Sequence, residues 1–331
     1  MVRFDFSGAV ALFETATTVA VCGHKNPDGD CLGSVLALTH ALRAKGVQAT
    51  PLLATGAKPA NLDLLAGYDE LVPAADYKED PDVFVMVDVP SDERMTDGAQ
   101  VKARAKATLK IDHHAGDDDV ADICYIDPSA AAAGVMVWDL IGQMGVERTA
   151  QIAQCCYVAL MTDTGSFRYQ NADASAFTLA AEMVAAGAEP ATAATQLYQR
   201  KTMAAVQLEA RVAERMRFAC DGHLVISWMD ERDLEEIGAT KDDCEELTDV
   251  VRQIAGPEVS VILRGMDGHI RGSIRSKTDH NVRVIAEKMN GGGHVAASGF
   301  TLHCPMDQAL ETVIANVAES FGITQESEDA R

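Results

Sequence analysis

The chain has 331 residues, of which 47% are hydrophobic, and it carries a formal net charge of −22. A chain of this length is expected to form about two domains, and none of its apolar runs reaches the ~18 residues that a membrane span needs. The acidic excess disfavours binding to long duplex nucleic acid, yet it still permits a small anion in a local basic pocket. The eight cysteines contain no CxxC pair. This usage favours a reducing compartment, so we expect a cytoplasmic protein without membrane association.

Residues 1–185 alternate between β-prone apolar runs and helical periodicity, as in α/β proteins. We expect strands at residues 18–23, 48–54, 82–88, 107–112 and 122–126. We expect helices at residues 7–16, 31–45, 130–144, 149–163 and 174–186. The run VFVMV within the third of these strands is apolar throughout, which indicates a parallel strand covered on both faces.

Beyond residue 190 the pattern is first helical and basic and then α+β. In that second part we expect strands at 223–229, 258–266, 269–276 and 298–303, and helices at 242–255, 281–289 and 305–320. Asp267-Gly268 between two β-prone runs indicates a hairpin. The prediction is therefore an α/β fold: a parallel-sheet domain over residues 1–190, a helical connector over 191–217, and a smaller α+β domain over 218–325. The two domains are expected to face each other across a hinged cleft that encloses the substrate.

Acidic residues and histidines follow apolar runs at four places. They are His24, Asp28 and Asp30 after the first strand, Asp88 after the third, Asp112, His113 and His114 after the fourth, and Asp163 after the helix at 149–163. Any one of these residues, taken alone, is most simply explained as part of a solvent-exposed turn. Taken together, they can meet at one edge of the sheet and form a site. Oxygen and imidazole ligands suit Mn²⁺ or Mg²⁺ better than thiolate-binding metals. Two such ions about 3.5–4 Å apart can stabilise both oxygens of a phosphoryl displacement.

These residues carry a resemblance to a known family. H-x-N-P-D-G-D at 24–30, Asp88, D-H-H at 112–114 and T-D-T-G-S-F at 162–167 resemble, in order, the four motifs of the DHH phosphoesterases with their RecJ-like DHH domain. Arg275-Ser276-Lys277, Gly-Gly-Gly-His at 291–294 and A-S-G-F at 297–300 resemble the DHH-associated domain that holds the substrate. The resemblance covers about residues 15–320 and is closest to the stand-alone nano-RNase and pAp-phosphatase branch.

The resemblance implies a site with two divalent ions, with Mn²⁺ favoured over Mg²⁺. It assigns His24, Asp28 and Asp88 to the first ion. It assigns Asp30, Asp88, His113 and Asp163 to the second, so that Asp88 bridges the two. His114 then faces the scissile phosphate with Asn26 beside it, Asp112 orients a neighbouring group, and a metal-bridging hydroxide is the nucleophile.

The glycine-rich segment of the second domain can bind an anion on physical grounds that are independent of the resemblance. Gly291, Gly292 and Gly293 let the backbone approach a ligand, and their amides can hold an anion. His294 adds a donor, and Arg275, with Lys277 nearby, can grip a phosphate. Residues 258–290 hold six basic against four acidic side chains, a basic island in an acidic protein. The same glycines formally fit a dinucleotide-binding fingerprint, but they follow a helical stretch rather than a strand.

The implied activity is metal-dependent hydrolysis of a short nucleotide, either single-stranded RNA of about 2–5 residues or the 3′-phosphate of pAp. The runner-up is a phosphodiesterase of cyclic di-nucleotides such as c-di-AMP, or of pApA. A nucleotide-binding regulator without catalysis would lack some of the metal ligands, and none of them is missing. The physiological substrate, the identity of the ion, the direction of attack and the choice between monomer and homodimer stay open.

Overall fold

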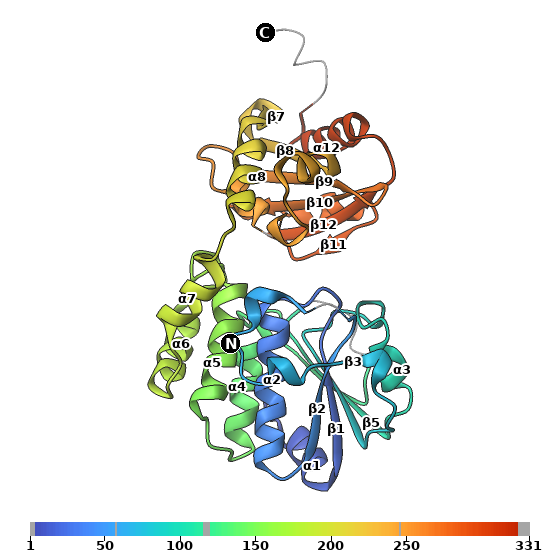
Figure 1. Ribbon diagram of the computed structural model, residues 1–331, viewed down its shortest axis with the longest axis vertical. Coiled ribbons are helices and arrows are strands. Elements are labelled where there is room, and N and C mark those ends of the chain that lie inside the picture. The colour runs from blue at the N-terminus through green and yellow to red at the C-terminus, as the bar shows by residue number, and fades with distance from the viewer. Residues whose placement is uncertain (1–3, 57, 115–119, 245, 324–331) are drawn as a thin grey trace. The chain divides into compact units, whose positions relative to one another are not determined.

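The computed structural model describes residues 4–56, 58–114, 120–244 and 246–323. Residues 324 and 325 of the predicted C-terminal domain lie outside this range. The chain divides into two compact units, Met1–Arg200 and Lys201–Arg331. Each unit has its own six-stranded sheet (Figure 1).

The sheet of the first unit is parallel throughout, with the order β3-β2-β1-β4-β5-β6. Its strands are β1 (Thr18–Cys22), β2 (Gln48–Leu53), β3 (Val72–Pro73), β4 (Val83–Val87), β5 (Ala107–Asp112) and β6 (Ile123–Ile126). The strand order reverses between β1 and β4, because β2 lies on the other side of β1. Open α/β sheets bind ligands beyond the carboxyl ends of the strands at such a reversal. The topology therefore favours a site just after Cys22 and Val87.

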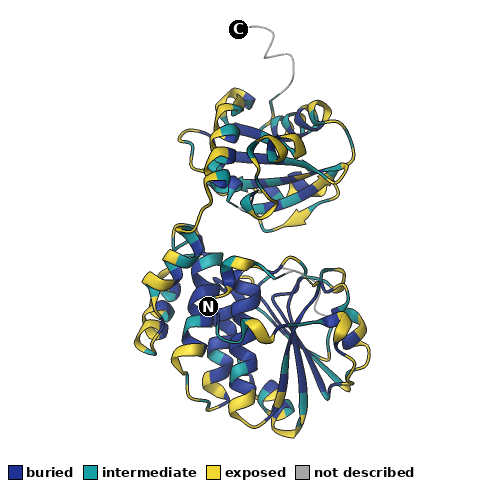
Figure 2. Cartoon of the chain, in the orientation of Figure 1, coloured by how far each residue is buried: buried dark blue, intermediate teal, exposed yellow. Residues whose placement is uncertain are grey.

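Helices cover both faces of this sheet. They are α1 (Ser7–Thr15), α2 (Gly29–Ala44), α3 (Gly98–Lys102), α4 (Ala133–Gln143), α5 (Ala150–Asp163), α6 (Ala174–Ala185) and α7 (Pro190–Tyr198), with short 3₁₀ turns η1 (Ala60–Leu62), η2 (Tyr68–Glu70), η3 (Ala74–Asp76) and η4 (Asp92–Arg94). Val85 of β4 joins the core formed with α2, α4 and α5, whereas Phe84 and Met86 join a second core that includes Val101 of α3. The predicted burial of β4 on both faces is confirmed (Figure 2).

The helices α2 and α5 pack unusually closely because glycines lie between them. A Cβ atom on Gly33 would lie 2.4 Å from the carbonyl oxygen of Cys155, and one on Gly29 would lie 2.5 Å from the Thr162 side chain. Neither approach is compatible with a larger residue unless the helices shift. This contact brings the end of α5, and with it Asp163, toward the start of α2.

The sheet of the second unit is mixed, with the order β11-β12-β10-β9-β8-β7. Its strands are β7 (Arg217–Ala219), β8 (Leu224–Asp230), β9 (Val259–Met266), β10 (His269–Ser276), β11 (Gly292–Gly293) and β12 (Ala297–Leu302). Its helices are α8 (Met203–Glu214), α9 (Glu231–Ile237), η5 (Cys220–Gly222), η6 (Asp242–Cys244), α10 (Leu247–Arg252), α11 (Val282–Glu287) and α12 (Met306–Ser320). Asp267 and Gly268 have φ of 54° and 74° in the turn from β9 to β10, so the predicted hairpin is confirmed.

The predicted connector, residues 191–217, contains two helices that pack in different units. Helix α7 contacts η1 in the first unit. Helix α8 buries Leu208 and Val212 in a core of the second unit, with Val225 of β8. The predicted helix at 242–255 is divided into η6 and α10. The short strands β3, β7 and β11 and helix α9 were not predicted from the sequence.

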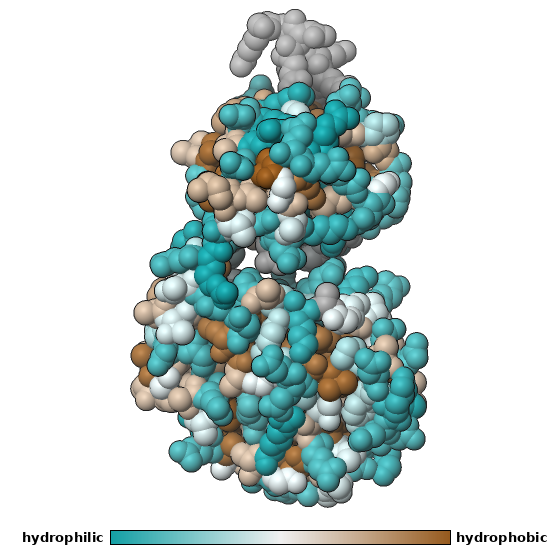
Figure 3. Space-filling view, in the orientation of Figure 1, coloured by the Kyte–Doolittle hydropathy of each residue, from teal (hydrophilic) through white to brown (hydrophobic). Residues whose placement is uncertain are grey.

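The described residues include no helix with the length and apolar character that crossing a membrane requires. On the face drawn in Figure 3, apolar residues form small groups separated by polar ones.

Candidate metal centre

His24 lies just after β1 and is 5% exposed. Its Nε2 atom is 3.3 Å from Oδ2 of Asp88 and 3.9 Å from Oδ1 of Asp28. Its Nδ1 atom is 2.8 Å from the carbonyl oxygen of Lys25, a geometry in which Nδ1–H donates. In the neutral ring this arrangement leaves the lone pair on Nε2, the atom that faces the carboxylates, as a metal ligand requires.

The turn from β1 to α2 supplies two further predicted residues. Asp28 is the N-cap of α2, since its Oδ1 accepts a hydrogen bond of 3.0 Å from the amide of Cys31. Its side chain is 61% exposed, so the carboxylate caps the helix at the open side of the cluster. Asn26 is exposed and has a φ of 54°, in the left-handed region that asparagine tolerates.

Asp88 occupies the centre of the cluster. It follows β4 directly, is 2% exposed and has a φ of 59°. Its Oδ2 faces His24, whereas its Oδ1 lies 3.5 Å from Nε2 of His113 and 3.4 Å from Nδ1 of His114. This buried Oδ1 has no hydrogen-bond partner among the described residues. One carboxylate therefore faces two groups of candidate ligands, an arrangement suited to bridging two ions.

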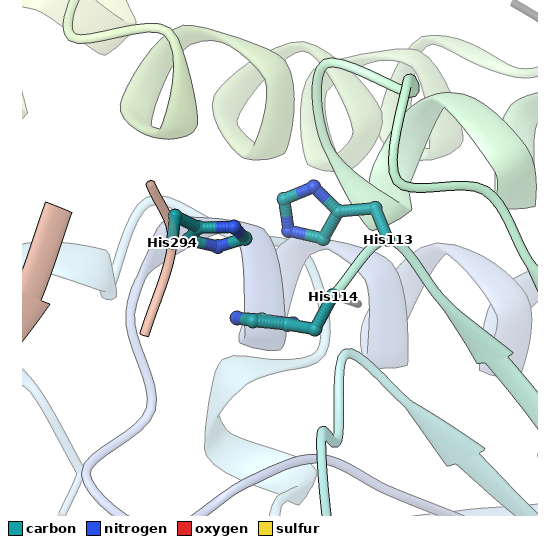
Figure 4. Close-up of side chains that lie close together, drawn as sticks. All are labelled: His113, His114 and His294. Atoms are coloured by element: carbon teal, nitrogen blue, oxygen red, sulfur yellow. The ribbon is translucent and has the colours of Figure 1, made fainter. Parts of the chain in front are cut away.

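A second group of candidate ligands lies on the other side of Asp88. Nε2 of His113 is 3.5 Å from Oδ2 of Asp30, and Nδ1 of His113 is 3.9 Å from Oδ2 of Asp163. One ligand atom from each of these three residues lies within 4.8 Å of the others. His113 and His114 project side by side from the end of β5, with ring centroids 4.8 Å apart (Figure 4). All six predicted ligands thus gather at the carboxyl edge of the first sheet.

Asp30 also anchors helix α4. Its Oδ2 accepts from the amide of Ala133 at 2.7 Å, and its Oδ1 accepts from the amide of Gly134 at 2.9 Å and from the Ser34 hydroxyl at 3.1 Å. Carboxylates are favoured at helix N-termini because the amides there have no partner within the helix. Asp30 is therefore fixed in place from three sides.

Asp112 and His114 form a hydrogen-bonded pair beside Asp88. Oδ1 of Asp112 accepts hydrogen bonds from the backbone amide of His114 at 3.1 Å and from its Nδ1 at 2.8 Å. Asp112 is fully buried, whereas the side chain of His114 is 22% exposed. The geometry fits the orienting role that the family resemblance implies for Asp112.

Burial and mutual repulsion shape the charges of the acidic residues. Burial, reinforced by the neighbouring carboxylate of Asp88, raises the pKa of Asp30 well above its ordinary value. Burial also raises the pKa of Asp163, to about 6. For Asp88 burial acts in the same direction, but His113 and His24 outweigh it and hold its pKa well below the ordinary range.

The histidines show the opposite balance. Burial alone lowers the pKa of His24, but the carboxylates of Asp88 and Asp28 raise it to about 9. Burial likewise lowers the pKa of His113, and Asp88 and Asp163 raise it well above its ordinary value. The cluster thus concentrates negative charge that positive charge must compensate, and divalent cations would do so.

The donor set fits hard divalent cations. It consists of carboxylate oxygens and imidazole nitrogens and includes the unpartnered Oδ1 of Asp88. Cys31 also lies beside His24 and Asp88, and the sequence analysis did not single it out. Burial raises the pKa of this thiol well above its ordinary value.

The structure adds other residues that the sequence analysis missed. Nδ2 of Asn171 donates to the carbonyl oxygen of Asp163 at 3.0 Å and to its Oδ2 at 3.3 Å. Lys110 is fully buried in β5, and its Nζ lies 3.3 Å from Oδ2 of Asp112. A charged residue in the run T-L-K-I-D was a visible signal for Lys110, whereas nothing marks Asn171 in the sequence.

The predicted substrate-binding residues lie in the second unit. Nη1 of Arg275 donates to the carbonyl oxygens of Ile274 and Ser298, at 3.0 and 3.1 Å. Nζ of Lys277 donates to the carbonyl oxygen of Ile254, and desolvation together with the charge of Arg252 lowers the pKa of this lysine.

Two of the three predicted glycines are required by the fold of this unit. A Cβ on Gly291 would lie 2.2 Å from the carbonyl oxygen of Gly299, and one on Gly293 would lie 2.6 Å from that of Ala297. Gly292 is exposed, and a Cβ there would meet open space. His294 begins the turn into β12, where its amide donates to Ala297 at 2.8 Å.

Comparisons with known proteins cover both units of the chain. The DHH family, N-terminal domain, matches residues 18–160, and the DHHA1 domain matches residues 221–321. The bifunctional oligoribonuclease and PAP phosphatase NrnA of Thermus thermophilus is 32% identical over 304 residues, covering 92% of this chain and 90% of that protein. The protein of the same name in Bacillus subtilis is 26% identical over 289 residues, covering 86% and 90%.

A solved structure extends the likeness to the fold. The crystal structure of an exopolyphosphatase-related protein from Bacteroides fragilis superposes with a TM-score of 0.89 over 95% of both chains, at 23% identity. Two successive domain matches and a relative that is similar over nearly the whole chain lead to one conclusion. The chain belongs to the DHH family of phosphoesterases and carries a DHHA1 domain after its DHH domain.

Proposed function

We propose that this protein is a divalent-cation-dependent phosphoesterase that hydrolyses short oligoribonucleotides and the 3′-phosphate of pAp. Two of its relatives bear the name of a bifunctional oligoribonuclease and PAP phosphatase. The observation that carries the proposal is the carboxylate of Asp88, which faces His24 with one oxygen and His113 with the other. A buried carboxylate oxygen without a hydrogen-bond partner is unfavourable in a folded protein. A cation bound at the centre of this cluster would compensate it.

The donor geometry supports two cation positions. His24, Asp28 and Asp88 would hold one ion, and Asp30, Asp88, His113 and Asp163 would hold the other. Mn²⁺ is preferred over Mg²⁺ because each set includes an imidazole beside its carboxylates. Such ions, when bound, polarise phosphoryl oxygens and lower the pKa of coordinated water.

His114 is proposed to act on the reacting phosphate. Its ring is partly exposed, and its Nδ1 donates to the buried carboxylate of Asp112. This carboxylate stabilises the charged imidazolium, which can donate to the developing charge on a phosphoryl or leaving oxygen. Asn26, in the exposed turn after His24, is proposed to contact the same phosphate.

The second unit is proposed to bind the rest of the nucleotide. The planar fork of Arg275 suits a phosphate, and the exposed amide of Gly292 with the side chain of His294 offers further donors. Lys277 adds positive charge on the same stretch. We propose a small nucleotide rather than long duplex nucleic acid as the substrate, and the cytoplasm as its location.

A turnover panel tests this function. The purified chain is given RNA of two to five nucleotides, pAp, pApA and c-di-AMP, each with Mn²⁺, with Mg²⁺ and with EDTA. We expect Mn²⁺ to support release of AMP from pAp and of mononucleotides from RNA, and EDTA to abolish both. Activity that survives EDTA contradicts the mechanism, and a higher kcat/KM for c-di-AMP than for RNA assigns the runner-up activity instead.

A further inference from the structure

Lys110 is a lysine in the middle of a buried strand. It is 0% exposed, and in the register of the sheet it lies between Met86 of β4 and Cys124 of β6. Lysine is rarely buried completely unless its charge is compensated, because desolvating an ammonium group is costly. A lysine in this position therefore calls for a reason beyond packing.

The compensating charge comes from Asp112. Nζ of Lys110 lies 3.3 Å from Oδ2 of Asp112, and both side chains are 0% exposed. Among the described residues neither of these two atoms has a hydrogen-bond partner. Each of these two atoms therefore has the other group as its electrostatic partner.

The other oxygen of Asp112 is committed to His114. It accepts from the backbone amide and from Nδ1 of that residue, at 3.1 and 2.8 Å. One buried carboxylate thus joins an ammonium group on one side to the imidazole on the other. In a low dielectric, removing the positive charge would change how strongly the carboxylate orients and polarises the ring.

We propose that Lys110 is a positioning residue for His114 and acts through Asp112. The inference rests on the proposed function, in which His114 acts on the reacting phosphate. Lys110 itself contacts no substrate. Its charge stabilises the Asp112 carboxylate, and this carboxylate in turn holds the ring of His114 in one tautomer and one orientation, as outer partners do at metal sites.

The test is a kinetic double-mutant cycle in the full chain with Mn²⁺ and pAp. Lys110→Met keeps an unbranched side chain, one atom shorter, and removes the charge, and Asp112→Asn removes the carboxylate. Losing an outer partner typically costs about 10- to 100-fold. We expect Lys110→Met to lower kcat by about that factor, with KM and Mn²⁺ affinity within about twofold of wild type. Lys106→Met is the matched control, because that lysine is 75% exposed and pairs with Asp82.

The cycle separates a positioning role from a structural one. If Lys110 acts through Asp112, the double variant has the same kcat as Asp112→Asn alone. If the two losses multiply, or if folded Lys110→Met retains the wild-type kcat, the inference is wrong. Should Lys110→Met fail to fold, Lys110→Gln decides, because its amide can still donate to Asp112 without carrying charge. A reduced kcat in Lys110→Gln supports the inference, and a wild-type kcat overturns it.

Failure of the proposed function gives a different result. In that case the wild-type chain itself shows no Mn²⁺-dependent hydrolysis of any substrate in the panel. The inference about Lys110 fails only when the wild-type chain is active and the variants match it.

Discussion

At the scale of single residues, Asp88 combines a strained backbone with the central position in the candidate metal centre. Its φ of 59° lies in a region that costs non-glycine residues free energy, and its carboxylate is buried. The backbone is held there because the amide of Asp88 donates to the carbonyl oxygen of Ile111 at 3.0 Å. The conformation directs one carboxylate toward His24 and His113 together, which an extended residue continuing β4 would not do.

Asp88→Asn should remove most of the response of the protein to Mn²⁺. A ligand at 100 times its dissociation constant stabilises a folded protein by about 2.7 kcal/mol, and an amide cannot replace a carboxylate shared by two ions. We expect Mn²⁺ to raise the Tm of the wild type and to leave that of Asp88→Asn nearly unchanged, as measured by thermal unfolding. Asp92→Asn is the control, since Asp92 is half exposed and pairs with Lys102. An equal rise in both variants would contradict the assignment of Asp88.

In the second unit, the buried carboxylate of Asp233 is expected to stabilise the fold. It is 1% exposed and accepts from Arg211 and Arg215 at 2.8 Å, and it forms the capping box of α9 with Asp230. Asp233→Asn removes the negative charge that compensates the two guanidinium groups. We therefore expect it to lower the free energy of unfolding by about 2–3 kcal/mol, as measured by urea denaturation. Asp267→Asn, in an exposed turn and paired with Lys241, should stay close to wild type.

Asp233 should also make the free energy of unfolding depend on pH. Burial opposes ionisation of Asp233, but the hydrogen bonds from Arg215, Asp230 and Arg211 outweigh it and lower its pKa. Because the folded pKa lies below the unfolded value of about 3.9, this stabilisation is present above pH 4 and is lost as the pH falls through the folded pKa. The stability of Asp233→Asn should therefore fall less steeply than that of the wild type below pH 4. Parallel curves would rule out this contribution.

At the scale of elements, the packing of α2 on α5 brings motifs from distant parts of the sequence together. Gly33→Ala inserts a methyl group where only 2.4 Å separates the new Cβ from the carbonyl oxygen of Cys155. We expect a loss of about 1–3 kcal/mol in stability, as in other overpacked cores. Because the helices must move apart, Mn²⁺ affinity should fall as well, which titration calorimetry would measure. Gly56→Ala, where a Cβ meets open space, is the control, and unchanged Mn²⁺ affinity in Gly33→Ala would contradict the argument.

The N-terminal cap of helix α4 could not be predicted from the sequence. Its periodicity predicted the helix, but the N-cap, Ala132, makes no side-chain hydrogen bond. The cap is supplied instead by Asp30, 103 residues earlier, through the amide of Ala133. A cap from a distant residue leaves no local signal, because N-terminal preferences are read from neighbouring side chains. The second role of Asp30, as an anchor for α4, therefore emerged only from the structure.

At the scale of the whole molecule, the parallel sheet and the meeting of the proposed metal ligands at its edge were predictable for one physical reason. Apolar runs mark buried strands, and parallel strands bring their carboxyl ends to one edge, so His24 and Asp88 could be expected to meet. The contacts that tune them were not predictable. The pairing of Lys110 with Asp112 depends on two side chains facing each other in a buried layer, and that of Asn171 with Asp163 on the turn after α5.

The two units should differ in what they can do alone. All six proposed metal ligands and the cores around β1 and β4 lie within residues 1–200, whereas Arg275 and the glycine-rich segment lie in the second unit. We expect a fragment of residues 1–200 to fold and to show a Mn²⁺-dependent rise in Tm, because its ligands and its sheet are complete. The same fragment should bind pAp at least tenfold more weakly than the full chain in titration calorimetry, a loss of about 1.4 kcal/mol or more.

The fragment carrying Asp88→Asn is the control for specific metal binding. A fragment that folds without responding to Mn²⁺ would show that the metal centre needs residues beyond Arg200, and one that binds pAp as tightly as the full chain would contradict the substrate-binding role of the second unit.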